Sequence, residues 1–149
     1  MSVKVTIESK LNQKISKAVD LYDENTQRHL NRVANHFKNQ IMKSMQRTPK
    51  DGRTYKRGAK THTASSKDNP PAIDTGRLVN SFFIRPATRL KNTSSVETRV
   101  SYASILEQSF ARGGLQRPFM GKESRAFKQT EQYANAKYKD ISIGKTKIL

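Results

Sequence analysis

The chain has 149 residues, with 29 Lys or Arg against 12 Asp or Glu, and its formal net charge is +17. That length fits one domain over residues 1–149, and an apolar fraction of 34% supports only a modest core. Cysteine is absent, which excludes disulfides, thiolate nucleophiles and cysteine metal sites. No segment approaches the roughly 18 apolar residues of a membrane span, and the N-terminus does not resemble a signal peptide. We therefore expect a soluble, non-exported protein whose charge attracts phosphate or acidic surfaces.

The first third of the chain changes from a strand-like to a helical pattern. Val3, Val5 and Ile7 alternate with polar residues, which predicts a short half-buried strand. No Pro or Gly interrupts residues 8–46, and apolar residues recur there at helical spacing. We predict one long amphipathic helix with an irregularity near residues 23–25, ending before Pro49. Its apolar face is formed by Leu11, Ile15, Val19, Tyr22, Leu30, Val33, Phe37, Ile41 and Met45.

Residues 47–73 form a long, basic segment that is rich in Pro and Gly. A structureless loop of this length is uncommon in a compact domain unless it is functional or disordered. Asp51-Gly52 also suits a hairpin turn that has residues 53–56 on its return arm. Three interpretations are open: a solvated mobile loop, a segment that follows a phosphate backbone, or one that meets acidic patches on a neighbouring subunit. The candidate contact residues are Lys50, Arg53, Lys56, Arg57, Lys60 and Lys67.

The second half of the chain predicts a small antiparallel sheet and two shorter helices. We expect Asp74 or Thr75 to cap a short helix that begins at Gly76. The expected elements are a helix over 76–82, paired strands over 82–90 and 95–102, helices over 103–110 and 123–139, and a β-leaning basic tail over 141–149. The inward residues of the two helices are Ile105, Leu106 and Phe110 in the first, and Ala126, Phe127, Tyr133 and Ala134 in the second. The predicted fold class is α+β, with the long N-terminal helix packed on the sheet.

The triplet Asp74-Thr75-Gly76 matches the catalytic signature of aspartic proteases. Such an enzyme needs two carboxylates that share a proton. Pro70-Pro71 cannot belong to the buried strand that should precede the triplet, and Arg77 would hold both carboxylates ionised. We therefore expect the Asp74 carboxylate or the Thr75 hydroxyl to accept from free amides at a helix start, which contributes about 1 kcal/mol.

Other catalytic or metal-binding arrangements are not indicated. His29 and His36 share a helix face two turns apart, and no third ligand lies between them. His62 sits in the basic segment, where it adds to the polarity of that segment. No nucleophile elbow and no glycine-rich phosphate cradle is present. We expect no enzymatic activity, no metal and no cofactor.

Four short motifs occur in a definite order after the long helix. They are GRTYKRG at 52–58, HTASSKDNPPAIDTGRLVNSF at 62–82, SYASILEQSF at 101–110 and RPFM at 117–120. In this order and spacing the chain resembles the tailed-bacteriophage family of neck and tail-completion (tail-component) proteins of long-tailed phages. The resemblance covers residues 11–138.

The resemblance implies a structural virion protein, assembled in the host cytoplasm. Such a protein forms a homo-oligomeric ring, expected to be a hexamer, around the DNA exit channel at the head–tail junction. Its partners would be adjacent head-completion and tail-tube or terminator proteins, with non-specific contact to genomic double-stranded DNA. The motifs Asp74-Thr75-Gly76 and Arg117-Pro118-Phe119 then serve as turns and caps.

Two residues of these motifs carry further expectations. Phe119 is an apolar anchor, either in the core or against another subunit, and Glu107 pairs with a cation, internally or across an interface. The alternative function is a free-standing, non-specific nucleic-acid-binding protein. It would be a monomer or dimer whose affinity for duplex DNA falls steeply with salt.

Overall fold

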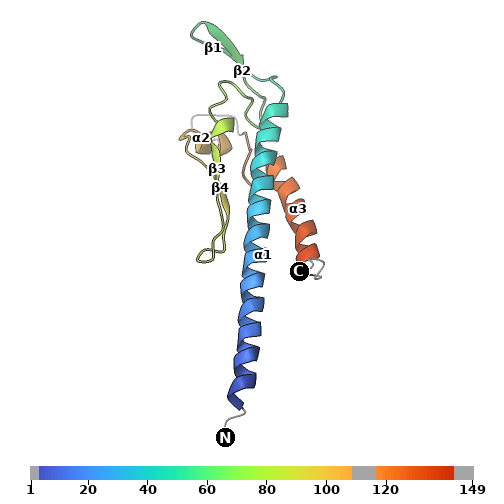
Figure 1. Ribbon diagram of the computed structural model, residues 1–149. Helices are drawn as coiled ribbons and strands as arrows, with labels where there is room; N and C mark the ends of the chain where they lie inside the picture. The colour runs from blue at the N-terminus through green and yellow to red at the C-terminus, as the bar shows by residue number, and fades with distance from the viewer. Residues whose placement is uncertain (1–3, 109–116, 143–149) are drawn as a thin grey trace.

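The computed structural model describes residues 4–108 and 117–142, arranged along one long helix. Helix α1 (Lys4–Arg47) has 44 residues and therefore rises about 66 Å. Figure 1 shows a hairpin beyond the C-terminal end of α1, while the other elements flank the second half of that helix. The predicted α+β fold is confirmed.

Two separate two-stranded antiparallel sheets replace the single predicted sheet. The first pairs β1 (Thr54–Arg57) with β2 (Lys60–Thr63). The second pairs β3 (Phe82–Arg85) with β4 (Ser95–Thr98), which confirms the predicted pairing, although both strands are shorter than expected. The remaining elements are the 3-10 helix η1 (Val79–Ser81), α2 (Ala103–Gln108) and α3 (Arg125–Ser142).

The N-terminal strand and the helix irregularity were both wrong predictions. Residues from Lys4 onward already belong to α1, and Val3 lies outside the described residues. Extending an existing helix costs less than nucleating a new element, and neither Pro nor Gly stops the extension. The helix is also continuous through residues 23–25, where Arg28 forms an ion pair with Glu24 at 3.0 Å across one turn.

The basic segment is ordered as a hairpin, and its turn lies later than predicted. The turn is at Gly58-Ala59 rather than at Asp51-Gly52. Gly58 has φ +62°, as tight hairpin turns require. Gly52 instead donates its amide to the Ala64 carbonyl at 2.8 Å, so it closes the base of the hairpin.

The core lies where α1, η1, β3, α2 and α3 meet. Its largest fully buried side chain is Phe119, which is 1% exposed. The Phe119 ring lies 6.0 Å from that of Phe82, so its expected role as a core anchor is confirmed. The other buried apolar members are Ile41, Met45, Leu78, Val79, Phe82, Val100, Ala103 and Ala126.

Helix α3 packs on α1 through the face that the sequence predicts. The Phe127 ring lies edge-on to Phe37, with centroids 6.2 Å apart. Tyr133 stacks on His36 at 4.1 Å with an interplanar angle of 5°. Residues 141 and 142 still belong to α3, which corrects the expected start of the tail, and the rest of the tail lies outside the described residues.

Helix α2 departs from its predicted apolar face. Leu106 packs against the core, whereas Ile105 is 55% exposed. Ala103 takes the buried position instead, and Phe110 lies outside the described residues.

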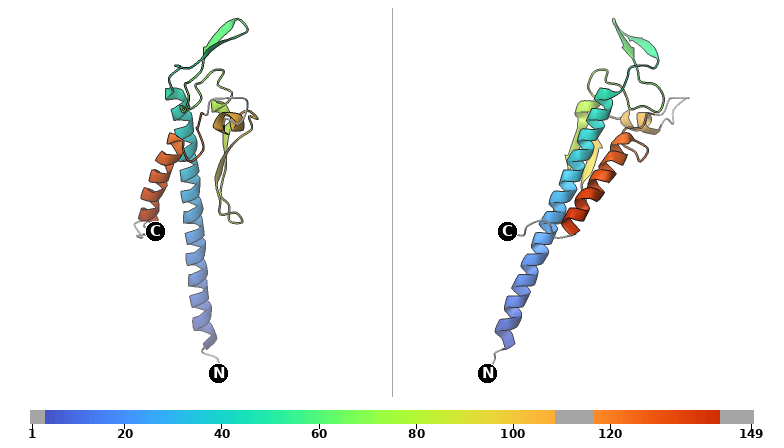
Figure 2. Two further views of the ribbon diagram at one scale, coloured as in Figure 1. Left: turned by 180° about the vertical axis from the view of Figure 1, so that it is seen from behind. Right: turned by 90° about the vertical axis from the view of Figure 1, so that its right-hand side faces the viewer.

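The first half of α1 extends beyond the other described elements in every view (Figure 2). Ile15, Val19 and Tyr22 lie one turn apart on it and are 52%, 53% and 65% exposed. This set of three side chains is called the α1 stripe below. None of the described helices combines the length with the apolar character that a bilayer span requires.

Replacing Phe119 by Ala should destabilise the fold by about 3–5 kcal/mol, because a buried ring is removed from a packed core. Ile105→Ala, a matched truncation at an exposed site, should change the unfolding free energy by less than about 0.5 kcal/mol. Urea unfolding followed by circular dichroism measures both values. Similar losses in the two variants would contradict the assigned core.

Candidate functional site

The β1–β2 hairpin carries the basic residues that the sequence singled out. All four β1 residues are exposed, Lys56 and Arg57 among them, and so is Lys60 after the turn. Lys50, Arg53 and Lys67 are exposed near its base. The structure therefore gathers the six cations on and beside one projecting hairpin.

Such a hairpin is marginal on its own, because two strands bury little surface. Cross-strand contacts support it: the hydroxyl oxygens of Thr54 and Thr63 are 2.9 Å apart. The Tyr55 ring meets His62 edge-on at 5.2 Å.

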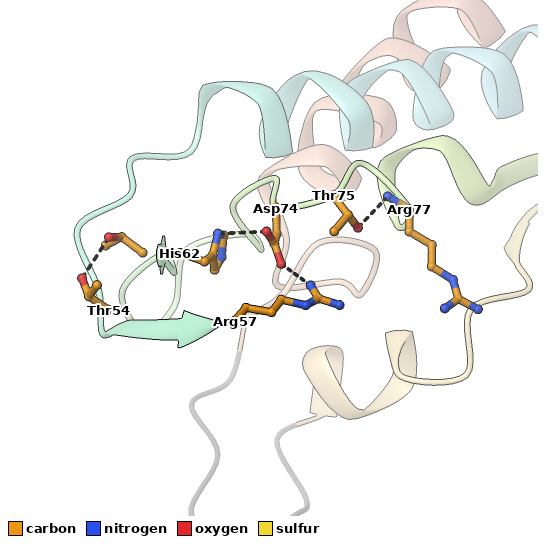
Figure 3. Close-up of polar contacts among 7 residues, drawn as sticks. Thr54, Arg57, His62, Asp74, Thr75 and Arg77 are labelled. Atoms are coloured by element: carbon orange, nitrogen blue, oxygen red, sulfur yellow. Dashed lines mark hydrogen bonds and ion pairs between the residues drawn. The ribbon is translucent and has the colours of Figure 1, made fainter. Parts of the chain in front are cut away.

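Asp74 anchors this hairpin to the body of the protein. One carboxylate oxygen accepts from the Arg57 guanidinium. The other lies 3.4 Å from Nδ1 of His62, whose ring is buried. Figure 3 shows both side chains pointing toward Asp74. The expectation that Asp74 caps a helix was wrong, because its two oxygens face partners that are remote in sequence.

Thr75 and Gly76 form a turn rather than the start of a regular helix. The Thr75 hydroxyl accepts from the Arg77 amide at 3.4 Å (Figure 3), and Gly76 has φ +79°. That left-handed conformation interrupts helical geometry. Of the helix expected over 76–82, only the 3-10 helix η1 is present. Leu78, the residue before η1, makes no side-chain capping hydrogen bond.

Hydrogen bonds between residues 51–53 and residues 64–66 close the base of the hairpin. The Ser66 amide donates to Asp51 Oδ1 at 3.0 Å, and the Ala64 amide donates to the Arg53 carbonyl at 3.1 Å. A Cβ on Gly52 would lie 2.3 Å from the Ser65 carbonyl oxygen, so only glycine fits. The backbone hydrogen bond from Ser66 lowers the pKa of the Asp51 carboxyl below its ordinary value.

Glu107 holds a turn of backbone instead of the expected cation. Its carboxylate accepts from the amides of Phe119, Met120 and Gly121 at 2.9, 3.1 and 2.6 Å. A Cβ on Gly121 would approach Glu107 Oε1 to 2.6 Å, so the glycine makes room for this contact. The carboxylate thereby seats Phe119 in the core. In the sequence, Gly121 is the residue that could have indicated this turn, because a glycine there leaves room for the Glu107 carboxylate.

Arg117 connects the same turn to the base of the hairpin. Its Nη2 donates to the Ser65 carbonyl at 3.1 Å, and its amide donates to the Leu106 carbonyl at 3.0 Å. Pro118 follows and has no amide to donate. Sequence reasoning missed Ser65, which is fully buried beneath Gly52.

A pocket of about 280 Å³ lies between the hairpin base and the Asp74 turn. Its polar lining comes from Tyr55, Arg57, His62, Ser65, Asp74, Thr75, Arg77, Tyr102 and Arg117. Its apolar lining includes Met45, Ile73, Leu78, Val79 and Leu106. The predicted motif residues Asp74, Thr75, Gly76 and Arg117 thus meet around one cavity.

The histidines of α1 are not arranged for metal binding. Within residues 4–108 and 117–142, no three His, Asp or Glu side chains gather as metal ligands would. His36 contacts Thr130 and Tyr133, and burial, with a smaller contribution from Lys43, lowers its pKa.

Comparison with known proteins adds no relative: no family model, curated protein or solved structure matches the chain. The phage resemblance therefore depends on the sequence motifs alone.

Asp74→Asn should loosen the hairpin while leaving the core intact. The pair with Arg57 is partly exposed, so its loss should cost at most about 1 kcal/mol globally. Amide exchange in residues 54–63 should nevertheless accelerate, because the contact to the body is lost. Asp20→Asn, which removes a remote exposed pair with Arg89, should leave that exchange unchanged. Equal exchange in both variants would rule out the anchor.

Asp51 should make stability depend on acid pH. The pKa of Asp51 is lowered in the folded state. Its contribution to the free energy of unfolding is therefore complete above the ordinary pKa of 3.8 and is lost as the pH falls below that value. Asp51→Asn keeps an acceptor oxygen without titrating. Between pH 5 and 3 the parent should therefore lose more unfolding free energy than the variant, as measured by urea unfolding at each pH. Parallel pH profiles would refute this assignment.

Proposed function

We propose that the chain is a structural virion protein that forms a homo-oligomeric ring, expected to be a hexamer, at the phage head–tail junction. It would surround the DNA exit channel and contact adjacent head-completion and tail-tube or terminator proteins. The four ordered sequence motifs support this proposal, together with the distribution of uncovered surface described below.

The observation that carries the proposal is the α1 stripe. Ile15, Val19 and Tyr22 remain largely exposed on a helix half that projects past the other described elements. Isolated helices are marginal in water, and most helical stability comes from packing an apolar face. Covering the stripe with a second copy would remove apolar surface from water, at about 25 cal/mol per Å².

The projecting hairpin supports the same conclusion. Within the part of the chain that the structure describes, each of its two strands has one unpaired edge, and exposed edges pair readily with other chains. The hairpin and the α1 stripe lie toward opposite ends of the molecule in Figure 1. Two different surfaces that bind in a head-to-tail manner generate rings when the rotation closes.

The cations of the hairpin suit a non-specific contact with DNA. Lys56 and Lys60 are exposed, while Arg57 is engaged by Asp74. Phosphate contacts of this kind gain affinity from counterion release and read no sequence. The exposed Tyr55 beside them also favours the alternative function, a free-standing nucleic-acid-binding protein.

Val19→Asp should prevent assembly, because an unpaired carboxylate would be buried in the interface. The expected loss is at least about tenfold in association constant, since such burial costs more than about 1.4 kcal/mol. Gln13→Asp adds the same charged side chain at an exposed position on the opposite face of α1 and should assemble like the parent protein. Light scattering and negative-stain microscopy over a concentration series measure the assembly.

The same samples separate the two functions. Rings in the parent and in Gln13→Asp, absent in Val19→Asp, support the virion role. A stable monomer in all three that binds duplex DNA with a steep salt dependence would instead establish the alternative.

A further inference from the structure

Two polar atoms beside the pocket at Asp74 are buried without a partner among the described residues. They are Oγ of Ser65 and Nε of Arg117. Ser65 is 0% exposed, and both residues line the pocket. Leaving such a group unpaired destabilises the folded protein. This corner would therefore be stabilised by a ligand oxygen.

The two residues that carry these atoms both line the pocket and contact each other. Nη2 of Arg117 donates to the Ser65 carbonyl at 3.1 Å, which fixes the guanidinium beside Ser65 and leaves Nε unengaged. A serine hydroxyl and a guanidinium Nε–H can both donate a hydrogen bond. The corner therefore offers two donors to an acceptor atom.

The charges around the pocket favour an anion. Three arginines line it, Arg57, Arg77 and Arg117, and Asp74 is the one acidic residue of its lining. That carboxylate is already engaged by Arg57 and His62. Among the described residues, neither Arg77 nor Arg117 forms an ion pair.

The other walls restrict the kind of anion. Leu78, Val79 and Leu106 line the pocket along with Met45 and Ile73, so much of the surface is apolar. A doubly charged phosphate would lose more hydration against these walls than a singly charged carboxylate does. A volume of about 280 Å³ limits the ligand to a small molecule or one side chain.

We propose that this pocket binds a monocarboxylate on a short aliphatic body. One carboxylate oxygen accepts from Ser65 Oγ and Arg117 Nε, and the aliphatic part lies against Leu78 and Leu106. Charge-assisted hydrogen bonds of this kind are about twice as strong as neutral ones. The carboxylate belongs either to a free short-chain acid or to an acidic side chain of a second copy. The site does not depend on the proposed virion role.

Titration with 4-methylpentanoate tests the site, with the Arg117 Nε–H resonance and the amides of residues 64–66 followed by nuclear magnetic resonance. Arg117→Lys assigns the side-chain signal by its loss. The acid should shift these resonances saturably, and 4-methylpentanamide, which has the same shape without the charge, should bind at least about tenfold more weakly. No saturable shift at tens of millimolar acid, or equal binding of the amide, would overturn the proposal.

A variant pair separates binding from folding. Ser65→Ala should weaken acid binding about tenfold while leaving the free protein at least as stable, because it removes an unpartnered hydroxyl. Ser66→Ala, next in the chain but outside the pocket lining, should leave the affinity unchanged. If Ser65→Ala instead destabilises the free protein, the hydroxyl is already satisfied by a buried water and the proposal fails.

Raising the protein concentration without added acid identifies the source of the carboxylate. A shift of the Arg117 Nε–H signal that follows self-association supports a side chain of a second copy as the occupant. A signal that responds to 4-methylpentanoate and not to self-association supports a free acid. A signal that responds to neither contradicts the site.

Discussion

The hydrogen bonds from three backbone amides to the Glu107 carboxylate support much of this structure. They fix residues 119–121 and so place Phe119 in the core. The same turn begins with Arg117, whose guanidinium holds the Ser65 carbonyl at the base of the hairpin. A carboxylate that accepts several amides at once is a strong local constraint. The core and the hairpin therefore depend on one side chain from α2.

The second constraint is the mismatch between helix length and core size. Helix α1 has 44 residues, yet its buried core residues Ile41 and Met45 lie near its C-terminal end. A protein with few apolar residues cannot cover so long a helix with its own chain. The exposed α1 stripe is a consequence of this mismatch. In the proposed ring, a neighbouring copy would cover it.

The sequence predicted helices and strands well where one local feature, such as a proline or an alternation of polar and apolar residues, decides the structure. Pro49 follows α1 closely, and β4, whose residues alternate in polarity, pairs with β3 across the predicted turn. The site was harder to predict, because its contacts join residues far apart in the chain. Asp74 is next to a turn, which suggested a cap, but Arg57 and His62 reach it from 17 and 12 residues away. Glu107 likewise binds backbone amides in place of a cation.

The arrangement around Asp74 also bears on the protease motif. A working dyad needs one proton shared between two carboxylates, and this requires an environment that disfavours ionisation of both. The Arg57 guanidinium bonds directly to one Asp74 oxygen, and the buried His62 lies against the other. Both acceptor oxygens of the carboxylate are thus engaged in holding the hairpin. An anchor and an acid–base catalyst make opposite demands on this group, and the observed contacts satisfy those of the anchor.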